Sequence, residues 1–195
     1  MNTSLERKQY SYAEYRKLVD DLLAKGMTTG TNQSEEIVKY AKLNVARMNR
    51  LDKTVSVLPE LRSAMEQLKG TYEWLVITEG WCGDASQSVP VIAAIASCSS
   101  RVEFKMILRD EYPEVMDQYL TNGTRSIPVL VVRDKATGKD LFKWGPRPAE
   151  LSTLVSEWKK TMDHEAFVEK IHAWYAHDKT QTLQHEILSL VQAMQ

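Results

Sequence analysis

The stretch Trp81-Cys82-Gly83-Asp84-Ala85-Ser86 decides how the rest of the sequence is interpreted. It follows an apolar run at residues 74–77 that is typical of a buried strand, and it leads into residues 86–97, whose apolar positions have helical spacing. A cysteine is therefore expected where a strand gives way to a helix. A dithiol redox site would carry a second cysteine three residues after the first, and here that residue is Ala85.

The expected position of Cys82 predicts a modestly activated thiol. Backbone N–H groups are unpaired in the first turn of a helix and the helix dipole is positive there, so a thiolate is stabilised. Its pKa should then fall below the free value of about 8.5. Asp84 opposes this shift because it is an anion within one turn of the sulfur. Ser86 is expected to be a polar residue of the first helical turn rather than a donor to a thiolate.

The segments that follow alternate between strand and helix patterns. Strands are expected at residues 102–108, 128–132 and 141–144, and helices at residues 114–120 and 149–160. The turn residues at 134–138 join the last two strands into a hairpin. The order β-α-β-α-β-β-α predicts the α/β class, with a mixed central sheet flanked by helices.

Both ends of the chain have helical patterns. Residues 1–70 are expected to form a helical extension packed on the core, and residues 71–160 the α/β domain. Residues 161–195 are expected to form C-terminal helices with two apolar stripes. Such stripes usually pack on their own domain. The alternative is a homodimer in which the terminal helices pack against a second subunit.

Two motifs together resemble the thioredoxin family. Trp81-Cys82-Gly83 is followed some 45 residues later by Gly123-Thr124-Arg125-Ser126-Ile127-Pro128 and then by the hairpin. The sequence is most similar to bacterial thioredoxin-like proteins with a Trp-Cys-Gly-Asp motif and a helical N-terminal extension. The resemblance implies a thioredoxin-like fold over residues 71–160, with Cys82 as the attacking cysteine, Trp81 as its flanking aromatic residue and Pro128 as the cis proline. A cis Pro128 would turn the backbone of Ile127 outward, where it could pair with an extended substrate.

The sequence departs from the family at two positions. Ala85 replaces the resolving cysteine, and Val76 stands where the family has a buried acid. Cys98 cannot take over, because an intervening helix would place it roughly 24 Å from Cys82. A self-contained dithiol cycle is therefore excluded. One hypothesis is a monothiol redox protein, in which Cys82 forms mixed disulfides with a protein or small thiol and an external thiol such as glutathione resolves them. The alternative is a non-catalytic interaction module of the same fold.

Composition excludes several other functions. The net charge of −1, with both signs interspersed, argues against a nucleic-acid surface. No apolar run is long enough for a membrane span, and two cysteines fit a reducing compartment, so a cytoplasmic protein is expected. No cofactor or metal is expected, since Glu165, Glu169 and His172 are predicted to form a solvated helix face. Lys143 and Arg147 are expected to be surface charges beside the hairpin, although they could bind the carboxylate of a small thiol.

Overall fold

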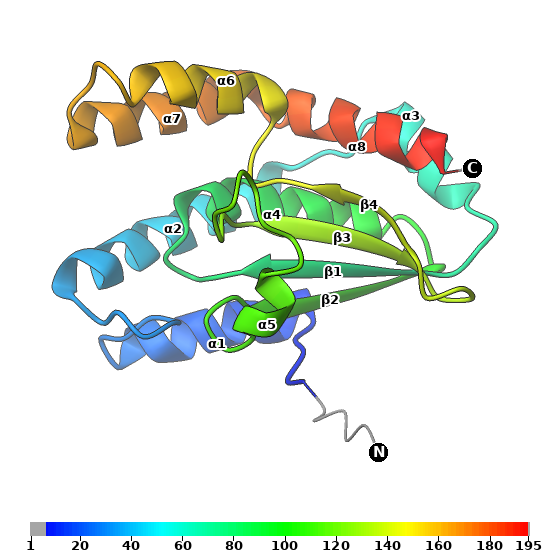
Figure 1. Ribbon diagram of the computed structural model, residues 1–195, viewed down its shortest axis with the longest axis horizontal. Helices are drawn as coiled ribbons and strands as arrows, with labels where there is room; N and C mark the ends of the chain where they lie inside the picture. The colour runs from blue at the N-terminus through cyan, green and yellow to red at the C-terminus, as the bar shows by residue number, and fades with distance from the viewer. Residues whose placement is uncertain (1–6, 195) are drawn as a thin grey trace.

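The computed structural model describes residues 7–194 and contains one four-stranded sheet (Figure 1). The strands are β1 (Tyr72–Thr78), β2 (Val102–Leu108), β3 (Val129–Asp134) and β4 (Asp140–Trp144), in the spatial order β2-β1-β3-β4. β1 and β2 are parallel, whereas β3 is antiparallel to both β1 and β4. Because β4 therefore runs in the same direction as β1, the carboxyl ends of these two strands lie at the same edge of the sheet.

β1 is a central strand, and its sequence shows why. Its residues from Trp74 to Thr78 are all buried, so the strand is nearly continuously apolar rather than alternating. Helix α4 (Gly83–Ala96) begins shortly after β1 and packs on β1 and β2. This strand-to-helix connection places Cys82 at the edge of the sheet.

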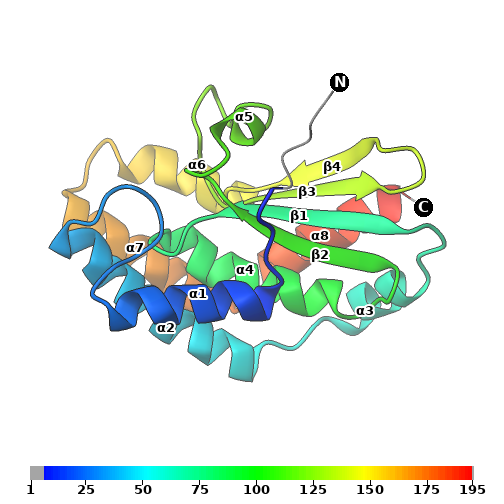
Figure 2. The same ribbon diagram turned by 90° about the horizontal axis from the view of Figure 1, so that it is seen from below.

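Helices lie on both sides of the sheet, but most of them pack on one side. α2 (Glu35–Thr54) packs on the outer side of α4, and the short helix α5 (Pro113–Met116) lies across the sheet from them (Figure 2). The predicted helix at residues 114–120 is wrong in length, because α5 ends at Met116. The following segment turns through Asn122 and Gly123, which both have positive φ, and Thr121 and Thr124 form an isolated bridge.

The N-terminal helices α1 (Tyr12–Ala24) and α3 (Pro59–Glu66) belong to the same hydrophobic core as the sheet. Ser11 begins α1 with a capping box that includes Glu14, and Ser34 caps α2. Just before α1, Tyr10 exchanges two backbone hydrogen bonds with Met106, of 2.9 and 2.8 Å. The N-terminal segment is thereby attached to the free edge of β2.

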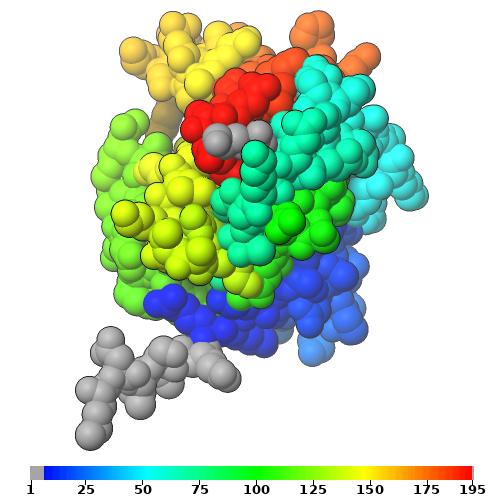
Figure 3. Space-filling view, turned by 90° about the vertical axis from the view of Figure 1, so that its right-hand side faces the viewer, coloured from blue at the N-terminus to red at the C-terminus, as the bar shows by residue number. Residues whose placement is uncertain are grey.

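The C-terminal helices pack in two different places. α8 (Gln181–Ala193) buries Leu183, Ile187 and Val191 in the main core and lies against α3 (Figure 3). α6 (Ala149–Trp158) and α7 (His164–Asp178) instead form a hairpin with a small core of its own. The buried members of that core are Leu151, Val155, Ile171 and Tyr175.

The mixed sheet flanked by helices, with helices before and after it, confirms the predicted α/β fold class. Among residues 7–194, no helix has both the length and the apolar character needed to cross a bilayer.

Candidate functional site around Cys82

Cys82 lies where the sequence predicts, between β1 and α4. It is the N-cap residue of α4, and its sulfur accepts a hydrogen bond from the backbone N–H of Ala85 at 3.5 Å. The thiol donates to the carbonyl oxygen of Ile127 at 3.3 Å, and the peptide bond between Ile127 and Pro128 is cis. The fold thus brings the cysteine motif and the proline loop together across a separation of 45 residues.

The expected activation of the thiol is wrong. Cys82 is 8% exposed, and burial together with the neighbouring Asp84 carboxylate raises its pKa to about 12. The N–H of Ala85 and the Arg147 guanidinium lower that pKa, but by less. Desolvation therefore outweighs the helix end, and the thiol is protonated at neutral pH.

The predicted docking edge for a substrate is closed. Ile127 and Pro128 are both buried, and the Ile127 carbonyl already accepts the hydrogen bond from Cys82. Trp81 is half-buried beneath the Arg109 guanidinium, which lies 4.7 Å from the ring centroid. This differs from the expectation of an outward-facing Ile127 backbone, because the residue is buried and its carbonyl is occupied by the Cys82 thiol.

Asp84 is the centre of a polar network that sequence analysis did not find. Its Oδ2 atom forms an ion pair with Arg147 and accepts a 3.2 Å hydrogen bond from the Arg147 Nε atom. Its Oδ1 atom accepts a hydrogen bond from the Tyr175 hydroxyl at 2.9 Å. Arg147 is thus half-buried and paired, not a free surface charge. One feature of the sequence could have predicted this contact. Arg147 follows β4, and the carboxyl ends of β4 and β1 lie at the same edge of the sheet.

Glu79 is a second residue that sequence analysis missed. It follows β1 directly, is completely buried, and has a pKa raised chiefly by that burial. Its Oε1 atom accepts the backbone N–H of Asp110 at 2.9 Å, while Oε2 has no hydrogen-bond partner in the described residues. The position expected for a buried acid, Val76, is apolar and fully buried. The structure therefore does have a buried carboxyl group in this segment, but at Glu79 rather than at the position of Val76.

Helix α7 covers the start of α4. A Cβ atom at Gly83 would lie 3.2 Å from the ring of His172, so a larger residue at this position would press against that ring. His172 Nδ1 lies 3.2 Å from the Gln87 side-chain nitrogen. The expected solvated face is therefore wrong for His172, whose pKa is lowered to about 4 by burial and by Arg47. The Ser86 hydroxyl donates to the Gly83 carbonyl at 2.6 Å and is a polar residue of the first turn.

A comparison with protein families identifies the fold family. The model of the family described as Thioredoxin matches residues 30–159, which is more than half of the chain. The chain belongs to the thioredoxin family. No curated protein matches it.

Two solved structures share the fold of this thioredoxin-family chain. One is a protein of unknown function from Pseudomonas aeruginosa, with a TM-score of 0.60 and 16% identity, covering 95% of this chain and 99% of that one. The other is an HIV epitope-scaffold, with a TM-score of 0.57 and 16% identity, covering 94% of this chain and 99% of that one. At this identity the likeness concerns the fold alone.

The thioredoxin-like site has no second thiol. Cys82 and Cys98 are both free, and Cys98 lies beyond the end of α4, where its thiol donates to the Ala94 carbonyl at 3.4 Å. Within the described part of the chain, no group of three histidine, cysteine or acidic side chains could hold a metal ion.

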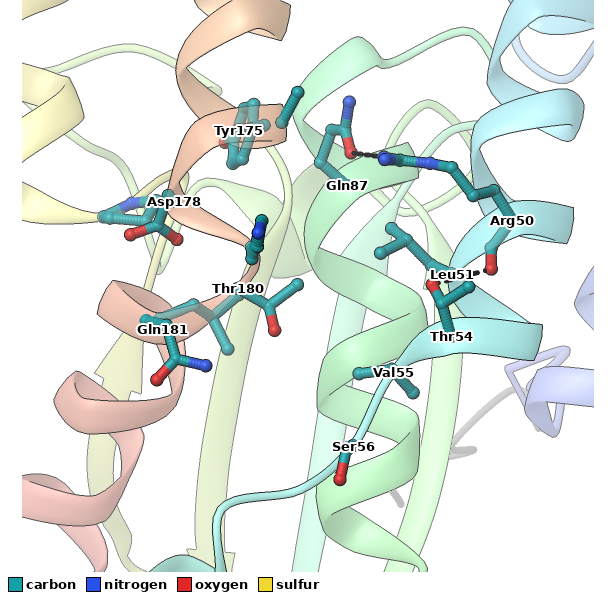
Figure 4. Close-up of a pocket in the computed structure, with 14 residues that line it drawn as sticks. Arg50, Leu51, Thr54, Val55, Ser56, Gln87, Tyr175, Asp178, Thr180 and Gln181 are labelled. Atoms are coloured by element: carbon teal, nitrogen blue, oxygen red, sulfur yellow. Dashed lines mark hydrogen bonds between the residues drawn. The ribbon is translucent and has the colours of Figure 1, made fainter.

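A cavity of about 440 Å³ adjoins the network on the side where α7 passes into α8 (Figure 4). Arg50 reaches into it from α2 and donates to the Gln87 side-chain oxygen at 3.3 Å. Tyr175 and Asp178 line the opposite wall. Gln87 and Tyr175 thus face this cavity. Close to Cys82, Gln87 also contacts His172, and Tyr175 contacts Asp84.

Proposed function

We propose that this thioredoxin-fold protein is a non-catalytic binding module. The observation that supports the proposal best is the burial of Cys82, a residue that is 8% exposed and whose thiol pKa is raised to about 12. A thiolate is the attacking species in disulfide exchange, so a thiol held protonated at neutral pH is a poor nucleophile. In addition, Ile127 and Pro128 are buried and offer no open edge to an extended substrate.

The rate of Cys82 alkylation by iodoacetamide as a function of pH tests the proposal. The experiment uses the Cys98→Ser variant, so that Cys82 supplies the whole signal. We expect the rate to keep rising through pH 10, well above the midpoint of about 8.5 for a free thiol. The same variant unfolded in guanidinium chloride should show the ordinary midpoint. A folded-state midpoint below that of the unfolded chain would contradict the proposal.

A monothiol redox function is the second candidate, and one contact favours it. The Arg147 guanidinium lies close enough to Cys82 to lower the pKa of its thiol, but it is paired with Asp84. If that ion pair opened, the Cys82 thiolate could attack a disulfide of a protein or small molecule, forming a mixed disulfide and releasing one thiolate. A second thiol such as glutathione would then exchange with the mixed disulfide and restore the Cys82 thiol.

The two candidates differ in a disulfide-reduction assay with excess glutathione. If the protein is a binding module, the reduction rate with wild-type protein or with the Cys82→Ser variant should equal the rate without protein. A rate increase with wild-type protein that disappears in Cys82→Ser would instead establish the redox candidate. Mass spectrometry of protein trapped with a fast alkylating agent provides a second readout, because a mixed disulfide on Cys82 would appear as a mass adduct.

A further inference from the structure

An open groove runs between α2 and α7, next to the covered site. Its volume is about 590 Å³, which is in the usual range for small-molecule sites. At one end of the groove, the Tyr40 hydroxyl and His164 Nε2 are 3.4 Å apart. At the other end, Arg47 lowers the pKa of His172. The two helices therefore run parallel and leave space between them. Leu43, which is 46% exposed, and Val168 give the groove an apolar wall.

Arg47 is unusual among the arginines of residues 7–194. The other four half-buried arginines each have a carboxylate within ion-pair distance; these are Arg16, Arg109, Arg133 and Arg147. Arg47 is also half-buried but has no such partner among residues 7–194, and burial together with the nearby Arg50 lowers its pKa. A partly desolvated guanidinium without a counter-ion favours an external anion.

The guanidinium of Arg47 is also held in place. Its Nη1 atom donates to the Asn44 side-chain oxygen at 2.7 Å. Asn44 is completely buried, and its nitrogen donates to the Gly80 carbonyl at 3.1 Å. The remaining guanidinium donors are therefore available for a ligand, and little side-chain entropy is lost when one binds.

Charge is distributed unevenly along the groove. Arg47 and the half-buried His172 form the inner end, whereas the rim carries three exposed carboxylates and one lysine. The rim residues are Glu36, Lys39, Glu165 and Glu169. A ligand that matches this pattern has an anionic group at one end and a cationic group at the other.

We propose that the groove between α2 and α7 binds a small peptide-like zwitterion, with its carboxylate on Arg47 and its ammonium group at the acidic rim. This assignment rests on the proposed binding function and names the class of ligand. The carboxylate replaces the missing counter-ion of Arg47, and the apolar wall formed by Leu43 and Val168 contacts the middle of the ligand.

Isothermal titration calorimetry with triglycine as the probe tests this proposal. We expect triglycine to bind, and N-acetyltriglycine and triglycinamide, which each lack one charge, to bind at least about tenfold more weakly. Inorganic phosphate distinguishes a general anion site from a zwitterion site. Phosphate binding as tight as that of triglycine would overturn the assignment, and so would the absence of triglycine binding at about 10 mM.

Two arginine variants show whether Arg47 is the contact. Arg47→Gln should weaken triglycine binding by about tenfold or more, while the control Arg62→Gln, at an exposed arginine, should bind like wild type. Equal binding by wild type and Arg47→Gln would overturn the site. Thermal unfolding of both variants shows that they are folded.

The ring proton of His172 supplies an independent readout by NMR, assigned by its loss in His172→Gln. A bound carboxylate offsets the effect of Arg47 and should raise the pKa of His172 from its value of about 4. An unchanged His172 titration at saturating triglycine would contradict binding at the inner end of the groove. Because triglycine contains no sulfur, these results do not depend on Cys82, and the alkylation test can fail or succeed separately.

Discussion

At the residue scale, two opposing effects act on the Cys82 sulfur. A helix N-terminus stabilises a nearby anion by about 0.3–1 kcal/mol, whereas burial can shift a pKa by up to about 3–5 units, or several kcal/mol. Burial is the largest influence on Cys82, and Asp84 adds to it. The outcome is a protonated thiol, even though the helix end alone would favour the thiolate.

Replacing Asp84 should partly reverse this balance. In Asp84→Asn, the carboxylate that raises the pKa of Cys82 is gone, and Arg147 loses the partner that neutralises it. We expect the Cys82 thiolate population, and with it the alkylation rate at pH 8, to increase by about tenfold. Asp117→Asn is a suitable control, since Asp117 pairs with Arg125 on the surface. Equal alkylation rates in wild type and Asp84→Asn would show that Asp84 does not control the thiol.

At the element scale, α8 is fixed to the rest of the protein by a buried side chain. Gln184 is completely buried, its oxygen accepts the backbone N–H of Leu58 at 2.8 Å, and its nitrogen donates to the Ser56 carbonyl at 3.1 Å. Gln184→Leu would leave both backbone groups without a partner. We expect a loss of about 1–3 kcal/mol in the free energy of unfolding, measured by urea denaturation. The exposed Gln192 on the same helix provides the control, and Gln192→Leu should change stability little. A loss of similar size in both variants would contradict a specific role for Gln184.

The same scale shows what the sequence can and cannot predict. The four strands and most helices were predictable because their apolar residues recur with the period of each element, and β2 matches its expected range of residues 102–108. α5 was overestimated because the chain leaves helical geometry after Met116, well before the turn at Asn122 and Gly123. The hydrogen bond between Cys82 and Ile127 and the pairing of Arg147 with Asp84 join segments far apart in the sequence, which local patterns do not report.

At the scale of the whole molecule, α7 connects the terminal helices to the candidate site. Its residue His172 lies against Gly83, and Tyr175 donates to Asp84, so one helix covers the first turn of α4. The α6–α7 hairpin has its own small apolar core. The contacts of α7 with α4 through His172 and Tyr175 are polar. His172 is the titratable histidine among these contacts.

The position of His172 predicts how stability depends on pH. Its pKa is about 4 in the folded protein, below its ordinary value of about 6.5, so the unfolded chain binds a proton more readily between these values. The stability contributed by neutral His172 is therefore present above pH 6.5 and is lost as the pH falls toward 4. Allowing for partial exposure of the ring, we expect His172 to account for about 1–2 kcal/mol of that loss. In His172→Gln the total loss of unfolding free energy between pH 6.5 and 4 should be smaller by this amount, so the average slope is shallower, whereas His185→Gln, at an exposed histidine, serves as the control. Urea denaturation at a series of pH values measures both slopes, and identical slopes in wild type and His172→Gln would mean that α7 does not hold a neutral histidine against α4.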